Sequence, residues 1–181
     1  MLIRDANAQR DAAACAAIYA PYVTDTAISL EELAPDEGEL GKRIEHTTRT
    51  HPWLVAQDGE AVVGFAYGCE HRSRAAYRWA ADVTVYVAGE RRRQGIGRAL
   101  YEALFGLLAR QGLHVACAGI TLPNEASVGV HEAMGFQAIG VYRRIAYKLG
   151  AWRDVGWWQL ELLAPGSRAP SRPGPTARID R

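Results

Sequence analysis

A glycine-rich turn between a strand and a helix is the feature that most restricts how this chain of 181 residues can fold. In residues 82–87, valines alternate with Asp82, Thr84 and Tyr86, which is the period of a strand with two different faces. The residues at 100, 103, 104, 107 and 108 are apolar, as on one side of an amphipathic helix, and Gly112 stands at the expected C-terminal cap. Residues 85–108 therefore predict a strand, a turn and a helix.

The turn carries Gly95 and Gly97 at the start of the helix. Unpaired N–H groups and the helix dipole favour an anion there, and glycines let a pyrophosphate approach the backbone. A dinucleotide fingerprint would need a third glycine where Leu100 stands, and a P-loop would need Gly-Lys-Ser/Thr. The bare motif is equally consistent with a tight turn bordered by the solvated arginines of residues 91–93.

The pattern Arg/Gln-x-x-Gly-x-Gly/Ala, here Arg92, Gly95 and Gly97, is similar to the signature of the GCN5-related N-acetyltransferases. Further segments resemble the phosphinothricin and methionine sulfoximine acetyltransferases. They are Thr84-Val85-Tyr86-Val87, residues 100–104, Leu122-Pro123-Asn124, residues 131–136, Tyr147-Lys148 and residues 152–159. The resemblance covers residues 2–163. It implies an α/β (α+β) fold, the acyl-CoA N-acyltransferase fold of this superfamily, with a central mixed, mostly antiparallel sheet flanked by helices.

The resemblance also implies acetyl-CoA as co-substrate and no metal. The pantetheine arm is expected along the strand and the pyrophosphate on the turn, with a further contact at Asn124, for which a simple turn role after Pro123 is the alternative. The expected cofactor-binding residues are Val85, Tyr86, Val87, Arg92, Arg93, Gln94, Gly95, Ile96, Gly97, Arg98 and Asn124.

Two residues are expected to move protons. An amine attacks a thioester only when it is neutral, so a base is needed, and Asp82 stands where the family usually has a glutamate. Its side chain is one methylene shorter, which favours a bridging water; the alternative is an ion pair with an arginine such as Arg78. His131 stands where the wider superfamily commonly has a tyrosine acid, and imidazole titrates near working pH. The alternative for His131 is a packed helix histidine.

Arg72, Arg74 and Tyr77 match the family positions that line the acceptor site. Two guanidinium groups suit a carboxylate or phosphinate, although a solvated loop cluster is the alternative. Leu30 replaces an aromatic residue of the phosphinothricin enzyme, which favours a small amino acid or its sulfoximine analogue more generally. Acetylation of a protein N-terminus, of a peptide or of a polyamine, and a non-catalytic acyl-CoA sensor, are the competing functions.

The rest of the sequence predicts further short strands and helices on both sides of residues 85–108. Strands are expected at 2–4, 53–57, 61–69, 113–122, 136–142 and 156–163, and helices at 11–22, 36–50 and 126–134. Asp58-Gly59 predicts a hairpin, Asp36 an N-cap, and Pro21 a turn that ends the first helix. Cys15, Cys69 and Cys117 are expected to be buried fillers.

Composition indicates one domain, residues 1–164, followed by a flexible tail rich in proline and arginine, residues 165–181. The net charge of +1 and the lack of stacking aromatics near the arginines argue against nucleic acid. No apolar run suits a membrane span or signal peptide, so a cytoplasmic enzyme with a small-molecule amine acceptor is expected. Family members are often homodimers, and Trp152, Trp157 and Trp158 could form such a surface.

Overall fold

A computed structural model describes residues 1–164, 166 and 172–179. The strands are β1 (Leu2–Asp5), β2 (Trp53–Asp58), β3 (Ala61–Glu70), β4 (Ala80–Val87), β5 (Val115–Leu122), β6 (Gln137–Lys148) and β7 (Ala151–Glu161). The α-helices are α1 (Ala8–Thr24), α2 (Glu37–Thr47), α3 (Ile96–Gln111) and α4 (Glu125–Ala133), and single 3-10 turns are η1 (Ala75–Tyr77) and η2 (Gly89–Arg91). This order confirms the expected alternation of strands and helices around one sheet.

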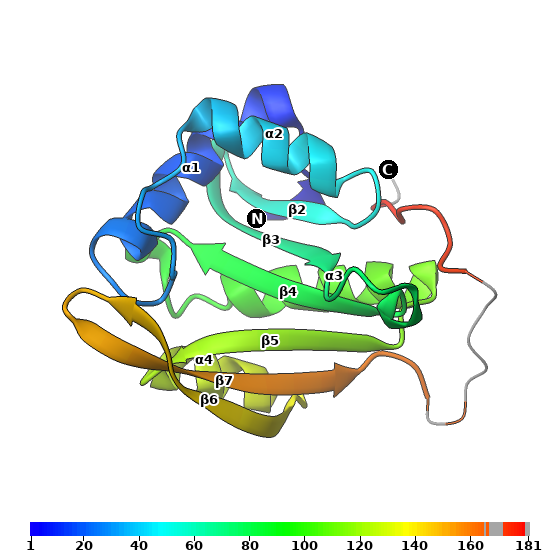
Figure 1. The fold of residues 1–181 in the computed structure, drawn as a ribbon. Helices are drawn as coiled ribbons and strands as arrows, with labels where there is room; N and C mark the ends of the chain where they lie inside the picture. Colours follow the sequence, from blue (N-terminus) through cyan, green and yellow to red (C-terminus); the bar gives the residue numbers. More distant parts are fainter. Residues whose placement is uncertain (165, 167–171, 180–181) are drawn as a thin grey trace.

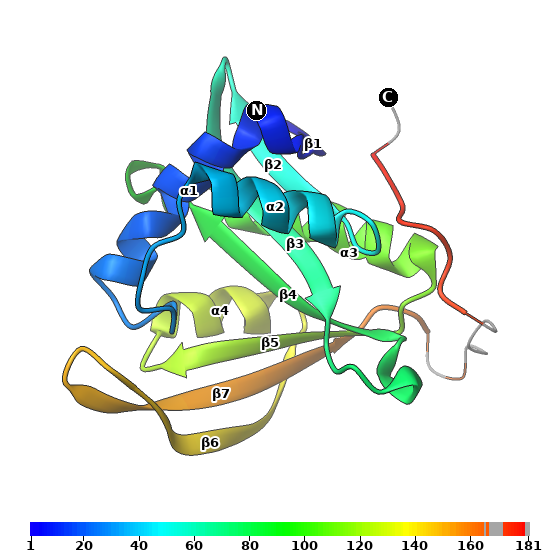
Figure 2. The ribbon, with the colours of Figure 1, turned by 45° about the horizontal axis from the view of Figure 1, so that its top comes forward.

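The strands form one mixed sheet in the order β1-β2-β3-β4-β5-β7-β6. All its neighbouring pairs within the described residues are antiparallel except β4 and β5, which run parallel. Helices α1 and α2 cover one face over β2 to β4, whereas α3 and α4 lie behind the sheet (Figures 1 and 2). The predicted mixed, mostly antiparallel sheet flanked by helices is confirmed.

The parallel pair β4 and β5 is joined for only part of its length. Residues Ala80, Ala81 and Asp82 pair with Val115, Ala116 and Cys117, and no later residue of β4 pairs with β5. Beyond this point the two ribbons separate toward the C-terminal end of β4 (Figure 1). The sheet therefore opens into a wedge whose closed end lies at Asp82 and Cys117.

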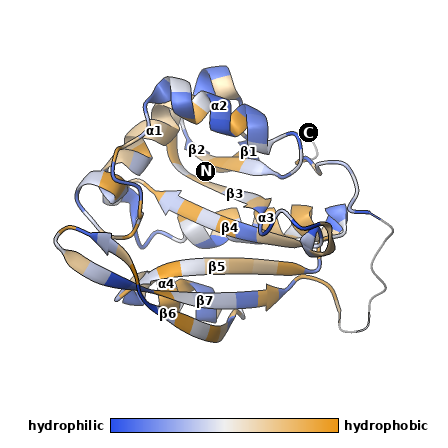
Figure 3. Cartoon of the chain, viewed as in Figure 1, coloured by the Kyte–Doolittle hydropathy of each residue, from blue (hydrophilic) through white to orange (hydrophobic). Residues whose placement is uncertain are grey.

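Two apolar clusters hold the sheet between its helices. One lies against α3 and includes Leu100, Leu104 and Leu108, all fully buried. The other lies under α1 and α2 and includes Trp53 and Phe65. Figure 3 shows apolar residues along β4 and β5 and a largely hydrophilic outer surface on α2. Because α1 and α2 reach only as far as β4, no helix of the described residues covers β5, β7 and β6 on that face (Figure 1).

Local signals placed the start of α2 and the end of α3 correctly. Asp36 accepts a hydrogen bond from the Glu39 amide as N-cap of α2, and Gly112 closes α3 in the left-handed conformation with φ of 91°. Pro21 does not end α1, because the helix continues to Thr24. A proline lacks only one backbone bond in the last turn, and the Asp25 amide still reaches the Pro21 carbonyl at 3.1 Å. The expected turn at Pro21 was wrong.

The last two strands are longer than the sequence predicts. They continue through residues 143–148 and 151–155 as a hairpin, with irregular register between Tyr142 and Ala146. Most of β6 is exposed on the edge of the sheet. An exposed strand does not need alternating apolar residues, so the sequence carries no pattern from which the length of β6 could be predicted. The expected boundary at Tyr142 was therefore too early.

Gly156 of β7 lies against the buried ring of Trp158, and a Cβ atom there would stand 2.7 Å from Cη2 of that ring. Gly156→Ala should therefore destabilise the fold by about 1–3 kcal/mol through overpacking. For a chain of this size, the melting temperature should fall by about 2–4 °C for each kcal/mol. Gly140→Ala is the matched control, because a Cβ atom at Gly140 meets nothing within 4 Å. Equal melting temperatures for both variants would contradict this packing.

Part of the C-terminal segment returns to the domain. The Gly174 amide donates to the Gln111 carbonyl at 2.7 Å, and Ala177 and Ile179 pack against the α3 cluster. The composition of residues 165–181 gave no sign of these contacts. Residues 165, 167–171 and 180–181 of the expected flexible tail lie outside the described residues. Among the helices of the described residues, none has both the length and the apolar character of a membrane span.

Candidate active site

The turn before α3 has the conformation of an anion cradle. Gly95 is left-handed, with φ of 77° and ψ of 0°, and no side chain caps the first amides of α3. Arg93 also takes a positive φ of 62°, which is uncommon outside glycine and tends to occur at functional sites. The amides at the start of this helix are therefore free to bind an anion.

Arginines surround this turn. The guanidinium of Arg92 lies 4.9 Å from the ring centre of Tyr22, and Arg98 pairs with Glu102 one turn along the helix. Arg91 pairs with Asp58 and also binds the side chain of Gln94, which holds the turn against the β2–β3 hairpin. Ile96 is buried in the α3 cluster and Gly97 packs beside Val85 and Val87, so both anchor the helix start to β4.

The free edge of β4 leads from this turn to the closed end of the wedge. The Ala88 amide donates to Val63 of β3 at 3.0 Å, so the alternation of the strand directs the amides of Val85 and Val87 toward the gap. From Val87 to Asp82 the strand spans about 16 Å at about 3.3 Å per residue. An extended chain with amide groups could pair with this edge as a further strand would.

Two cavities open from the gap. A small cavity of about 80 Å³ lies in the gap itself, and a larger one of about 450 Å³ lies beside it under α1. Ile28, Tyr86, Gly119 and Thr121 line both. A larger hollow, of about 730 Å³, lies elsewhere, around the N-terminus of α4, and is lined by neither Asp82 nor the turn before α3. The two adjoining cavities connect the wedge to the uncovered face of the sheet.

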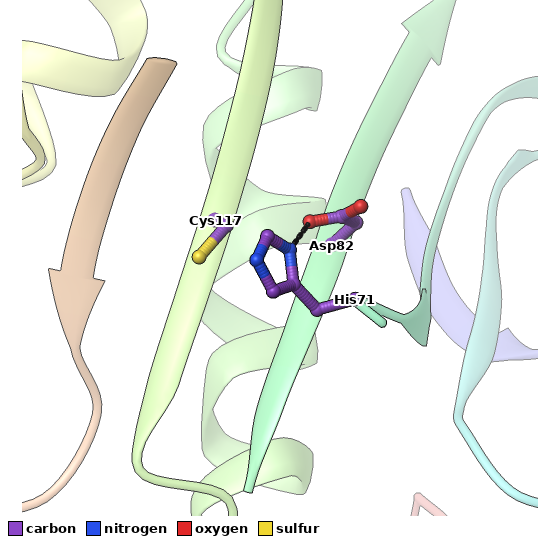
Figure 4. A group of neighbouring side chains, drawn as sticks. All are labelled: His71, Asp82 and Cys117. Carbon is purple, nitrogen blue, oxygen red and sulfur yellow. Dashed lines mark hydrogen bonds and ion pairs between the residues drawn. The ribbon is translucent and has the colours of Figure 1, made fainter. Parts of the chain in front are cut away.

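Asp82 lies at the closed end of the wedge and its side chain is 27% exposed. Its carboxylate oxygen Oδ1 lies 2.6 Å from Nδ1 of His71 (Figure 4). The alternative of an ion pair with Arg78 was wrong, because that guanidinium donates to the Ala75 carbonyl and stacks on Trp79. Burial raises the pKa of Asp82, while the bond to His71 and the charge of Arg72 lower it.

The three residues expected to bind the acceptor differ in how close they lie to the Asp82 carboxylate. Arg72 stacks over Trp157 at 5.7 Å and donates to the His71 carbonyl at 2.9 Å. The Tyr77 ring lies 5.8 Å from the His71 ring. Arg74 is exposed, and within the described part of the chain its side chain makes no hydrogen bond or ion pair. The structure thus gathers Arg72 and Tyr77 around His71.

His131 lies in α4 and is 4% exposed. Its Nδ1 lies 2.7 Å from the Ser127 carbonyl, which can only accept, so Nδ1 carries the proton and Nε2 accepts from the Tyr101 hydroxyl at 3.1 Å. Burial lowers the pKa of His131 and raises that of Tyr101. Both residues line the gap cavity. His131 is therefore packed as the alternative reading expected, and its role as an acid stays a prediction.

Asn124 caps the N-terminus of α4, where its side chain accepts a hydrogen bond from the Ser127 amide at 3.1 Å. Its amide nitrogen makes no hydrogen bond with the described residues and the side chain lines the gap cavity. This cap is a local structural role, in line with the alternative of a turn residue after Pro123. Whether it also contacts acetyl-CoA stays a prediction.

Sequence reasoning missed His71, Tyr101 and Cys117. No spacing signal could have found His71, because a loop and the turn η1 separate it from Asp82 in the chain. Cys117 is buried as expected and lies beside His71 and Asp82. Burial raises the pKa of its thiol to about 11. Cys69 is only half-buried, so the expectation that all three cysteines are buried was wrong for one of them.

Fold and site together define an acetyl-CoA-dependent N-acetyltransferase. The chain belongs to the GNAT acetyltransferase family, since the family model described as Acetyltransferase (GNAT) domain matches residues 3–157. It is 37% identical to the phosphinothricin N-acetyltransferase of Streptomyces viridochromogenes, over 94% of this chain and 93% of that protein. It is 33% identical to an L-methionine sulfoximine/L-methionine sulfone acetyltransferase of Pseudomonas aeruginosa, over 88% of this chain and 94% of that protein.

A solved structure also resembles the chain closely. It is a GNAT superfamily phosphinothricin acetyltransferase from Sinorhizobium meliloti in complex with AcCoA, with a TM-score of 0.90 and 30% identity. The match covers 99% of this chain and 98% of that one. The expected family resemblance is confirmed by these comparisons.

Proposed function

We propose that this enzyme transfers acetyl from acetyl-CoA to the amino group of a small amino-acid-like acceptor of the phosphinothricin or methionine sulfoximine type. The observation that carries the proposal is the cavity of about 450 Å³ that adjoins the wedge on the uncovered face. Its volume suits a small molecule. Relatives named for phosphinothricin and methionine sulfoximine support the same acceptor class.

The charges around the cavity support an acceptor with an anionic group. Arg72 is the cation beside Trp157, whose ring packs over Gly119 in the cavity wall. Glu31 also lines the cavity, but two hydrogen bonds from Arg43 compensate its charge. In this proposal Arg72 binds the acceptor carboxylate or its phosphinate counterpart. Tyr77, whose ring lies 5.8 Å from that of His71, and the exposed Arg74 complete the acceptor site in this proposal.

The residues of the wedge supply the remaining functions in this proposal. The cradle and the free edge of β4 hold acetyl-CoA through the eleven residues named for it in the sequence. The carboxylate of Asp82, directly or through a group bound to it, removes a proton from the acceptor ammonium. The neutral amine then attacks the thioester. Tyr101 and His131 line the gap cavity, and in this proposal the Tyr101 hydroxyl turns away from Nε2 of His131 to donate a hydrogen bond to the departing thiolate.

A thiol-release assay with acetyl-CoA and a panel of amines tests the acceptor class. Phosphinothricin, methionine sulfoximine and methionine sulfone should release thiol faster than polyamines or a peptide with a free N-terminus. Release with the peptide alone would overturn the proposed acceptor in favour of a protein or peptide substrate. Tight binding of CoA without release for any amine would favour an acyl-CoA sensor.

We also propose a homodimer through β6 and its hairpin. The large apolar residues exposed there are Ile139, Val141, Tyr142, Ile145, Tyr147, Leu149 and Trp152, and β6 is an edge strand. The expected tryptophan surface needs correction, because Trp158 is only 6% exposed and Trp157 is half-buried, whereas Trp152 is 61% exposed. Sedimentation should give twice the mass of 19.8 kDa, and Ile145→Glu should shift the protein to monomer. A wild-type monomer at micromolar concentration would contradict the proposal.

The site of action that we propose is the cytoplasm. Cys15, Cys69 and Cys117 form no disulfide, as is usual for proteins of a reducing compartment. Acetyl-CoA as co-substrate supports the same compartment. Fractionation of cells that express the tagged chain would test this location.

A further inference from the structure

The imidazole of His71 lies at the closed end of the wedge, between Asp82 of β4 and Cys117 of β5 (Figure 4). Asp82 and Cys117 are register partners, so both side chains stand on the same face of the sheet, the face that opens toward the acceptor cavity. His71 follows β3 directly and covers this pair. Its side chain is only 16% exposed.

Contacts on several sides fix the orientation of the His71 ring. Nδ1 lies 2.6 Å from the Asp82 carboxylate, and the edge of the ring meets Trp157 at 6.0 Å between centres. Tyr77 lies on another side at 5.8 Å. Nε2, on the side of Cys117 in Figure 4, has no hydrogen-bond partner within the residues that the structure describes.

This arrangement selects one tautomer of the imidazole. A carboxylate accepts but cannot donate when it is ionised, so the proton of neutral His71 lies on Nδ1 and the lone pair on Nε2. A base must present a free lone pair to the proton that it removes. Asp82 has a short side chain, and its Oδ1 is already engaged with the ring. Within the described residues, both Oδ2 of Asp82 and Nε2 of His71 lack a hydrogen-bond partner, and Nε2 is the one on the side of Cys117 and β5 (Figure 4).

We propose that Nε2 of His71 takes the proton from the acceptor ammonium, and that Asp82 is a positioning residue that fixes the tautomer and stabilises the imidazolium. This inference rests on the proposed function. One N–H bond of the ammonium breaks, its electron pair stays on nitrogen, and the proton bonds to Nε2. The amine nitrogen then forms a bond to the acetyl carbon, the C–S bond breaks, and the sulfur leaves with that electron pair as thiolate. The second proton that the nitrogen loses passes to this thiolate, which gives the neutral amide and the CoA thiol. His71 returns its proton to solvent after product release.

Several titratable or charged groups lie around His71. They are Asp82 of β4, Cys117 of β5, Cys69 at the end of β3, Tyr77 of η1 and Arg72, the next residue along the chain. Asp82 and Arg72 are the charged ones, and they act in opposite directions on an imidazolium. Burial raises the pKa of both cysteine thiols to about 11, so they stay neutral in the working range.

The same three side chains could instead hold a metal ion, because one donor atom of each lies within 4.8 Å of the others. The short bond between His71 and Asp82 already uses two of these donors. A metal role and a base role predict different results with a chelator. The experiment below separates them.

The test compares wild type, His71→Gln and His71→Ala with saturating acetyl-CoA and the best amine of the panel. The turnover number of His71→Gln should fall about 100-fold, as for loss of a general base, with unchanged acetyl-CoA affinity. Its pH profile should lose the limb that reports deprotonation of the base, and added imidazole should restore activity to His71→Ala. His46→Gln, the same change on the exposed side of α2, is the matched control and should behave as wild type.

Turnover of His71→Gln within threefold of wild type, or an unchanged pH profile, would overturn the proposal and leave Asp82 as the base. Loss of wild-type activity with EDTA and its return with Zn²⁺ would overturn it in favour of a metal site. If the histidine variants do not fold, the tautomer of His71 in the wild-type enzyme can still test the proposal. A ¹H–¹⁵N spectrum of the wild type at pH 8 should show His71 protonated on Nδ1. The opposite tautomer would contradict the proposal. A wild type that acetylates no amine would refute the proposed function first.

Discussion

The turnover number of Asp82→Asn should fall about 100-fold, the usual loss when an acid–base group is disabled, while its acetyl-CoA affinity stays that of wild type. Asparagine has nearly the same shape, but its neutral amide can neither stabilise an imidazolium nor accept a proton. The affinity should not change because Asp82 lies at the closed end of the wedge, about 16 Å from the cradle at Val87. Steady-state kinetics and calorimetry with acetyl-CoA measure the two quantities separately.

Asp25→Asn, an exposed substitution at the end of α1, is the control for Asp82→Asn and should leave the turnover unchanged. In a double variant with His71→Gln, the Asp82 change should add little further loss, because residues that act as one unit are not additive. A turnover near that of wild type in Asp82→Asn would remove this carboxylate from the mechanism altogether.

The dissociation constant for acetyl-CoA should rise about 5- to 30-fold in Gly95→Ala. Gly95 is left-handed, with φ of 77°, and this conformation costs an L-residue about 1–2 kcal/mol. Each 1.4 kcal/mol is worth about a factor of ten in affinity. No atom lies within 4 Å of a Cβ atom there, so the backbone conformation alone carries the effect. The turn relaxes and its amides no longer converge on the pyrophosphate.

Gly106→Ala is the matched control in the same helix. Gly106 is exposed, a Cβ atom at this position meets nothing within 4 Å, and its φ is not positive. Alanine should stabilise α3 by about 0.5–1 kcal/mol and leave acetyl-CoA affinity unchanged. If Gly95→Ala also bound acetyl-CoA with wild-type affinity, the turn would not be the pyrophosphate site.

Features that depend on neighbours in the chain could be predicted from the sequence. The cap at Asp36, the end of α3 at Gly112 and the turn at Gly95 follow from the conformations that these residues favour. The alternation in residues 82–87 correctly put Asp82 on a different face from Val83 and Val85, which pack against α3. The confirmed family resemblance added the mixed sheet and its cofactor.

Features that depend on distant contacts could not be predicted. The partner of Asp82 is His71, and only the pairing of β3 with β4 brings them together. The sequence suggested Arg78 because it is close in the chain and has the opposite charge. The bridging water expected beside the short aspartate stays a prediction, and the structure shows that an imidazole also lies beside the carboxylate.

The tryptophans of β7 are a second example of features that the sequence alone could not predict. Trp157 and Trp158 are adjacent in β7, so their side chains point to opposite faces of the sheet. Trp158 packs into the α3 cluster, and Trp157 lies beside Arg72 and His71 on the acceptor face. Sequence alone cannot say which face each tryptophan takes, because both faces of β7 carry apolar residues.

Transfer of acetyl from acetyl-CoA to an amino group is the reaction assigned to this wedge. The most direct measurement is mass spectrometry of the products after incubation with acetyl-CoA labelled in the acetyl group and methionine sulfoximine or phosphinothricin. The account predicts the label as an amide on the acceptor nitrogen, with one free CoA for each acetylated molecule. Free CoA with labelled acetate and no acetylated acceptor would contradict it.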